Sequence, residues 1–458
     1  MTGIAAWLRG VISARHRVVS SPPSQVRHAQ AALSRTVADA NNAFAAAIYR
    51  QLCHHPGNIF LSPLSIHAIL TLAQTGASGD TATQMRDMLG LRSLDDPLSA
   101  VVDPLEALKS EVSANGELAV ANGIWVHDGM TLRSEFEAAA ASCGARATLV
   151  DFHRRSDAAR ALINEWVDAI TKHKIRELVP PGLLDANTRL VMANAIYFKG
   201  RWVSQFPKAH TREGQFFLEQ GGTTSVPFMH QEVAIPHART AMYEAVQLPY
   251  KGNGVSMVIV LPNPGRPLHD VEAVFSATML RECLSAMRVY PLDVFLPRFT
   301  LRWAADLSLD LAVLGMRLAF TADADFSGIN GAVPRDDDAL YIRAVLHKAF
   351  VDVNEEGTEA GAATAVVMTA LGLPPTFRAD RPFLFVIIEQ QSGAVLFVGR
   401  VATARVVSGI TAAPGHSALW FVGARGRPAS VKTMTVSPVG TVVRRLARIF
   451  ILDRIAPL

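Results

Sequence analysis

The residue types that usually perform chemistry in enzymes are present in this chain of 458 residues, but their spacing does not fit a catalytic site. The chain contains no Gly-x-Ser-x-Gly nucleophile turn, no His-Glu-x-x-His zinc motif, no Gly-rich phosphate loop and no dinucleotide Gly fingerprint. His230 and His237 lack a third ligand at a useful spacing, and Cys53, Cys143 and Cys283 fit neither a metal motif nor a disulfide framework. We therefore expect no enzyme, no metal and no cofactor.

The stretch from Ala360 to Phe377 contains no charge, which is unusual for a connection between strands. It follows an alternating run, Tyr341–Val353, and precedes an apolar run, Pro382–Ile388, and both runs read as strands. The stretch itself contains mostly Ala, Gly, Thr and Val, a composition that also allows an ordinary Ala-rich helix.

The same stretch could become a strand, because side chains of a strand alternate between two faces. If Glu359 faced water, the side chains facing the interior would all be small or apolar: Thr358, Ala360, Ala362, Thr364, Val366 and Met368. About a dozen added strand residues would contribute on the order of 10 kcal/mol, at roughly 0.5–1.5 kcal/mol net per hydrogen bond. The segment can therefore be a loop in one state and a strand in another.

Several motifs in fixed order carry a family resemblance. Glu355–Thr364 reads Glu-Glu-Gly-Thr-Glu-Ala-Gly-Ala-Ala-Thr. The other motifs, in chain order, are Asn58–Ile66, Thr75–Ala77, Asn194–Trp202, Leu296–Phe299, Asp325–Gly328, His347–Phe350 and Pro382–Phe385. Together they resemble the serpins, the suicide-type protease inhibitors, in their inhibitory form, and they span about residues 40 to 405.

The periodicities predict a mixed α+β domain without an internal repeat. Helices are expected at Val37–Leu52, after the Ser62-Pro63 cap, at Asp80–Leu89 and at Ser156–Thr171. Further strands are expected at Leu118–Val126, Arg189–Phe198, Glu244–Leu248, Ser256–Leu261 and Asp293–Phe299. The resemblance implies the serpin fold: about three β-sheets surrounded by about eight or nine helices, with an exposed reactive-centre loop.

The expected domains are a basic extension over residues 1–38, a serpin domain over 39–405 and a basic extension over 406–458. The first 38 residues carry five Arg and no acid, and residues 408–458 carry a net +6. Since the whole chain has a formal charge of +4, the body between them is left with about −7. The first extension is interpreted as a targeting or disordered segment. The second is interpreted as disordered, and it contains a run, Val442–Leu452, that could form a basic amphipathic helix.

The resemblance implies a mechanism and assigns residues to it. A serine protease would cleave the loop, and insertion of the loop into the central sheet would trap the acyl-enzyme. Counting from both ends of the family pattern places the reactive bond at Leu371-Gly372, with Met368, Ala370 or Leu373 as alternatives for the bait. The hinge is Glu355, Gly357, Thr358, Glu359, Ala360, Gly361, Ala362 and Ala363.

Two further groups match family positions that control insertion. Glu355 and Arg298 match a charged latch at the top of the sheet, beside Trp202. Ser62, Ser65, Asn194 and His347 match the polar cluster over which the central strands part. Simple satisfaction of buried hydrogen bonds is a compatible reading of that cluster.

The expected partner is a serine protease of the chymotrypsin, elastase or subtilisin type, held in a covalent complex, since no Lys or Arg occurs from Ala360 to Phe377. No nucleic acid is expected, and no heparin, because Pro97–Val112 contains Lys109 as its single base. The alternative function is that of a non-inhibitory carrier, chaperone or storage protein. A monomer in which loop-sheet polymerisation is possible is expected, and the location is extracellular by resemblance, with cytoplasm or an organelle as alternatives.

Overall fold

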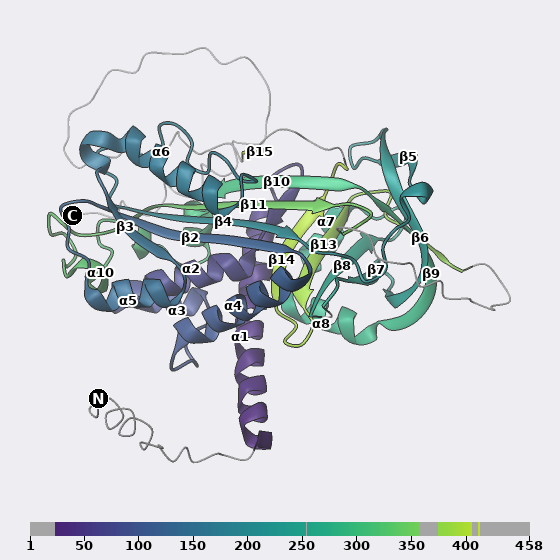
Figure 1. The fold of residues 1–458 in the computed structure, drawn as a ribbon, viewed down its shortest axis with the longest axis horizontal. Coiled ribbons are helices and arrows are strands. Elements are labelled where there is room, and N and C mark those ends of the chain that lie inside the picture. The colour runs from purple at the N-terminus through teal and green to yellow at the C-terminus, as the bar shows by residue number, and fades with distance from the viewer. Residues whose placement is uncertain (1–22, 253, 358–373, 405–410, 413–458) are drawn as a thin grey trace, which may run out of the picture. The chain divides into compact units, whose positions relative to one another are not determined.

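The computed structural model describes residues 23–252, 254–357, 374–404 and 411–412 (Figure 1). The chain divides into two units, Met1–Pro414 and Gly415–Leu458, and the second unit lies outside the described residues. The described residues form ten α-helices and fifteen strands. None of the helices in this part of the chain is long and apolar enough to cross a membrane.

A six-stranded sheet forms the centre of the body, in the order β15-β10-β11-β4-β2-β3 (Figure 1). The strand bounds are β2 Glu117–His127, β3 Arg146–Val150, β4 Leu190–Lys199, β10 Phe299–Asp306, β11 Ile342–Val353 and β15 Thr411–Ala412. The two central strands β11 and β4 are parallel to each other, and each is antiparallel to its outer neighbour. β4 is buried along nearly its whole length, as expected for a strand that is covered on both faces.

A nine-stranded sheet packs beside the first. Its main path is β1-β14-β13-β8-β7-β6-β9-β12, and β5 pairs with β6. The bounds are β1 Ile59–Leu61, β5 Arg212–Phe217, β6 Thr223–Arg239, β7 Tyr243–Pro249, β8 Val255–Pro262, β9 Arg288–Pro297, β12 Thr376–Arg378, β13 Phe383–Glu389 and β14 Val395–Val401. β6 is 17 residues long and pairs with β5, β7 and β9, so it holds these strands in one sheet. The described strands therefore form two hydrogen-bonded sheets where about three were expected.

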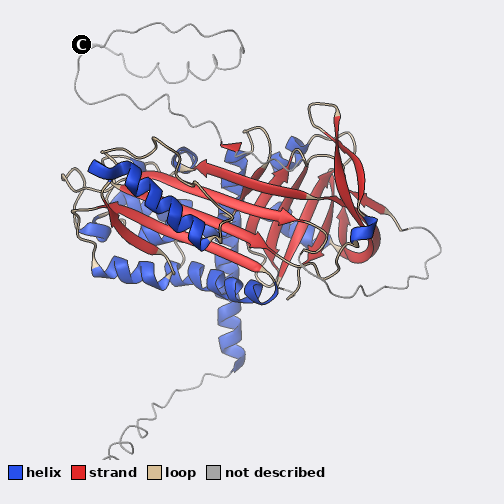
Figure 2. Cartoon of the chain, turned by 45° about the horizontal axis from the view of Figure 1, so that its top comes forward, coloured by secondary structure: helices blue, strands red, loops and turns tan. Residues whose placement is uncertain are grey.

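The helices surround these sheets (Figure 2). Their bounds are α1 Pro23–Leu52, α2 Pro63–Thr75, α3 Gly79–Met88, α4 Pro97–Asn115, α5 Ser134–Ser142, α6 Phe152–Ile170, α7 Leu268–Val274, α8 Ala277–Ala286, α9 Ser308–Val313 and α10 Ser327–Asn330. α6 lies across one face of the six-stranded sheet, over an apolar cluster that includes Trp125, Ile163 and Val167. A larger core lies on the opposite face, between the two sheets and α2.

The predicted helices and strands are present with shifted ends, and one prediction needs correction. The run Asp293–Phe299 was expected to be a single strand, but β9 ends at Pro297 and β10 begins at Phe299. The backbone N–H of Arg298 between them donates to Pro227 O (2.9 Å). The chain changes sheets at this residue, because β9 belongs to the nine-stranded sheet and β10 to the six-stranded one.

Candidate functional site

The chain leaves the end of β11 through a tightly held corner around Glu355. The side chain of Glu355 is buried, and its carboxylate accepts a hydrogen bond from Thr211 Oγ1 (2.7 Å). Arg298 Nε lies 3.5 Å from the second carboxylate oxygen, and Glu355 O accepts a hydrogen bond from Phe206 N (3.1 Å). Since Arg298 joins β9 to β10, the ion pair attaches the start of the loop to the junction of the two sheets.

Trp202 contacts this corner through Asn354. Its side chain is 1% exposed, and its indole Nε1 donates to Asn354 O (2.9 Å). The ring stacks on Tyr250, with 4.3 Å between ring centroids and 12° between planes. The structure therefore brings the three predicted residues Glu355, Arg298 and Trp202 to one place, and it adds Thr211, which sequence reasoning missed.

Gly357 lies close against the backbone of Arg201 and Trp202. Its φ is +55°, and a Cβ there would lie 2.2 Å from Trp202 N, so the backbone must move if any side chain is introduced. The adjacent residue is also held, because Gln205 Nε2 donates to Glu356 O (3.0 Å) and Lys208 forms an ion pair with Glu356. The predicted hinge residues Thr358, Glu359, Ala360, Gly361, Ala362 and Ala363, and the reactive bond Leu371-Gly372, lie outside the described residues.

The loop is anchored again at β12, whose Thr376–Arg378 pair in parallel with Asp293–Phe295 of β9. The Arg378 guanidinium carbon lies 4.7 Å from the ring centroid of Phe228 and 4.6 Å from that of Phe295. Cation–π contacts to two rings favour this placement. Sequence reasoning missed Arg378, and the only signal was a lone cation at the end of an uncharged stretch.

A buried polar network crosses the six-stranded sheet below the corner. Ser62 N donates to His347 Nε2 (3.2 Å), and His347 Nδ1 is bonded to Asn194 Oδ1. Asn194 Nδ2 donates to Ser65 Oγ and to Asn122 Oδ1. The network therefore links α2 and its cap to β11, β4 and β2. It contains all four predicted residues and adds Asn122, which had no sequence signal because its place depends on strand pairing.

The network fixes the protonation state of His347. Since Nε2 accepts the Ser62 N–H, the proton must be on Nδ1, which donates to Asn194. Burial lowers the pKa of His347 to about 3. The ring is therefore neutral at ordinary pH, and it bridges the two strands β11 and β4 without carrying a charge.

The histidines and cysteines that were considered as metal ligands lie outside the corner and the polar network. His230 pairs with Asp293, and His237 Nε2 lies 2.8 Å from Glu244 Oε1. The cysteines are free thiols, and burial raises the pKa of Cys283 to about 11, so this thiol is not a ready nucleophile.

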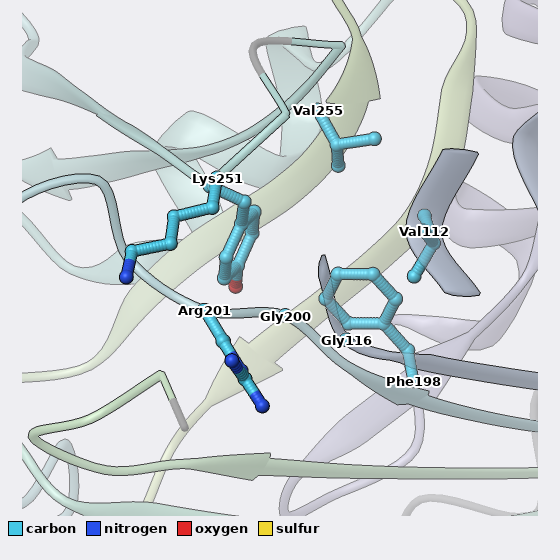
Figure 3. Close-up of a pocket in the computed structure, with 8 residues that line it drawn as sticks. Val112, Gly116, Phe198, Gly200, Arg201, Lys251 and Val255 are labelled. Atoms are coloured by element: carbon cyan, nitrogen blue, oxygen red, sulfur yellow. The ribbon is translucent and has the colours of Figure 1, made fainter. Parts of the chain in front are cut away.

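A small pocket opens beside the corner, where α4 ends and the chain leaves the sheet after β4 (Figure 3). Phe198 and Val112 form one side, and Arg201 and Lys251 are its charged side chains. Burial raises the pKa of Tyr250, which also lines the pocket, well above its usual value. The pocket offers no acid–base pair at these residues.

Comparisons with known proteins agree with this architecture. Residues 39–404 match the family model described as "Serpin (serine protease inhibitor)". The chain is 36% identical to the leukocyte elastase inhibitor of Equus caballus, over 80% of this chain and 98% of that protein. It is 33% identical to antithrombin-III of Mus musculus, over 79% of this chain and 80% of that protein.

A solved structure gives the same result. The structure of Arabidopsis AtSerpin1 in its native stressed conformation superposes with a TM-score of 0.75 at 29% identity. The match covers 81% of this chain and 98% of that one. The α+β fold class and the resemblance predicted from the motifs are confirmed: this chain belongs to the serpin family.

Proposed function

We propose that this protein is a non-catalytic inhibitor of a serine protease. It acts as a suicide substrate and traps the protease in a covalent complex. The protease cleaves the segment between Gly357 and Pro374, with Leu371-Gly372 as the reactive bond, and becomes an acyl-enzyme. The cleaved segment then inserts into the six-stranded sheet before the ester is hydrolysed. Distortion of the protease stops deacylation, since losing one oxyanion donor costs roughly 10²–10³ in rate.

The observation that carries the proposal is the direct parallel pairing of β4 with β11. Nine residue pairs join the two strands, from Leu190 opposite Ile342 to Phe198 opposite Val351. The chain leaves the top of β11 at the corner, so a segment that turned back would run antiparallel to both strands. Insertion would replace one parallel pairing with two antiparallel ones, which are slightly more stable per residue.

The corner lies where an inserted strand would begin, and the polar network lies where the strand would pass between β11 and β4. The Glu355–Arg298 pair and the close contact at Gly357 hold the chain where a new strand would begin. The bridge from His347 to Asn194 crosses the boundary between β11 and β4 that the new strand would occupy. Insertion must therefore replace this hydrogen bond, and the neutral ring allows the exchange without uncovering a buried charge.

The target class follows from the bait. A Leu at position 371 suits the apolar pocket of chymotrypsin-, elastase- or subtilisin-like proteases, and the uncharged segment gives a trypsin-like enzyme no Lys or Arg. The horse relative is named for inhibition of leukocyte elastase, which fits this class. A monomer is the proposed working form, and pairing of the loop of one copy with the sheet of another is its hazard. An extracellular location is proposed from the family resemblance, with cytoplasm or an organelle as alternatives.

The test is incubation with chymotrypsin, followed by boiling in detergent and electrophoresis. We expect a covalent band at the combined mass of the protease and the larger inhibitor fragment, and mass spectrometry of the released fragment fixes the cleaved bond. Thr358→Arg places a long cation on the face expected to be interior, so it should turn the inhibitor into a substrate. Glu359→Arg is the matched control, because the same side chain then faces water.

Two results would contradict the proposal. Clean cleavage of the wild-type chain without a detergent-stable complex would favour a carrier, chaperone or storage role. Equal complex yields from Thr358→Arg and Glu359→Arg would show that the segment does not enter a sheet in the expected register.

A further inference from the structure

Three side chains with metal-binding chemistry lie together beside the beginning of α6: His127, Asp128 and Asp151. β2 and β3 are parallel neighbours, with His127 opposite Val150. An aspartate follows each strand directly, Asp128 after β2 and Asp151 after β3, so the two residues lie at the same end of the sheet. One ligand atom from each of the three residues lies within 4.8 Å of the others.

One buried atom of this cluster has no partner within the protein. His127 Nδ1 is inaccessible to solvent and has no hydrogen-bond partner, and the Asp128 Oδ1 atom lies 3.6 Å away. Asp151 Oδ1 caps α6 by accepting from Arg154 N (2.8 Å), which leaves the second oxygen for another partner. In the part of the chain that the structure describes, neither carboxylate forms an ion pair with a Lys or Arg.

The cluster contains one unpartnered buried nitrogen and two carboxylates whose charge a cation would neutralise. Two neighbouring carboxylates repel each other, and a buried nitrogen without a partner loses the hydrogen bond that it makes in water. The backbone around them is nevertheless fixed, since His127 N donates to Arg189 O (2.9 Å) and Asp128 N to Val150 O (2.8 Å). A cation could therefore bind with little reorganisation of the chain.

We propose that His127, Asp128 and Asp151 bind one divalent transition-metal ion of the Zn²⁺ class. The ligands are Nδ1 of the imidazole and one oxygen of each carboxylate, and water completes the coordination. Imidazole nitrogen and carboxylate oxygen both bind Zn²⁺ at about 2.0–2.2 Å, whereas Ca²⁺ and Mg²⁺ prefer oxygen ligands alone. A motif search misses the site because Asp151 lies far from His127 along the sequence.

The position of the site gives it a consequence for the sheet. Asp151 is the N-cap of α6, and α6 lies over an apolar cluster that includes Trp125 of β2 and Phe350 of β11. A metal ion would attach the beginning of this helix to the ends of β2 and β3. Insertion between β4 and β11 must widen the sheet beneath α6, so a bound ion should slow it. This consequence rests on the proposed function, whereas metal binding does not.

The test is calorimetric titration of the chelator-treated full chain with ZnCl₂. We expect one ion per chain, and Asp128→Asn and Asp151→Asn should each weaken the affinity at least roughly tenfold. Asn also serves as an N-cap, so Asp151→Asn removes the ligand while the beginning of α6 is retained. Asp157→Asn is the matched control, since it removes a charge from the same helix at a side chain that is 91% exposed.

Three outcomes would overturn the site. These are the absence of binding heat, binding that neither ligand variant weakens, and equal weakening by Asp157→Asn, which would indicate a general charge effect. In a second measurement, the rate of covalent complex formation with chymotrypsin should fall when ZnCl₂ is added to the wild-type chain but not to Asp128→Asn. Binding lost in both ligand variants supports the site even if no complex forms, so failure of the proposed function remains distinguishable.

Discussion

Cleavage of the loop by a protease that is not trapped should make the protein more stable. Limited proteolysis near Leu371 frees the segment that follows Gly357, and we expect that segment to insert between β4 and β11. The boundary between these strands is the parallel ladder of nine residue pairs. Each inserted residue offers one N–H and one C=O, so the new strand can bond to both neighbours while the single ladder is lost.

The expected magnitude follows from the size of that exchange. About a dozen inserted residues, at roughly 0.5–1.5 kcal/mol net per added hydrogen bond, contribute on the order of 10 kcal/mol. The entropy of unfolding is about 2.1 cal/mol/K per residue, or about 0.8 kcal/mol/K for a domain of roughly 370 residues. The melting temperature should therefore rise by about 13 °C.

Scanning calorimetry of the intact and the nicked protein measures this change. Nicking should raise the melting temperature of Thr358→Arg much less than that of the wild type, because a buried Arg without a partner opposes insertion of the first residues. Nicking should raise the melting temperature of Glu359→Arg as much as that of the wild type. An unchanged melting temperature in the nicked wild type, with both fragments still associated, would refute the spring-loaded arrangement.

The remaining predictions concern the polar network, a buried ion pair and the bait. Burial lowers the pKa of His347 to about 3, below the roughly 6.5 of an unfolded chain, so between these values the unfolded state binds more protons. Stability should therefore fall by about 1.4 kcal/mol per pH unit as pH drops from 6.5 toward 3. His347→Gln should remove this part of the pH dependence, as measured by urea unfolding at pH 5 and 7. The same change in unfolding free energy between the two pH values in the variant and the wild type would contradict the prediction. Arg400→Met should cost about 3–5 kcal/mol by urea unfolding, because the buried carboxylate of Glu272 loses a partner at 3.0 Å; a cost below 1 kcal/mol would show that this carboxylate does not need the ion pair. Leu371→Arg should shift inhibition from chymotrypsin to trypsin, as measured by complex yields, and an unchanged preference would place the reactive bond elsewhere.

Sequence reasoning reached the fold through several short motifs in a fixed order. Alternation located β2, β4, β7, β8 and β11 to within one residue, since one-sided or complete burial leaves a period of two or an apolar run. It placed the end of β9 incorrectly, because the residues on both sides of Arg298 remain extended and only their neighbours change. The number of about three sheets came from the family resemblance, and hydrogen bonding along β6 joins the described strands into two.

The candidate site shows the same division. Glu355, Arg298 and Trp202 were predicted from motifs; the structure pairs Glu355 with Arg298 and bonds Trp202 to Asn354, the residue before Glu355. The hinge beyond Gly357 and the reactive bond remain predictions from sequence.

The sequence by itself determined which residues could line an inserted strand, because small size, absence of charge and alternation are local properties. It also determined the family, because ordered motifs are properties of the chain. Tertiary structure alone decided that β4 pairs directly with β11, that Asn122 joins the buried network, and that Asp128 meets Asp151. Each of these depends on which strands become neighbours and in which register, and a one-residue change of register would separate the same side chains.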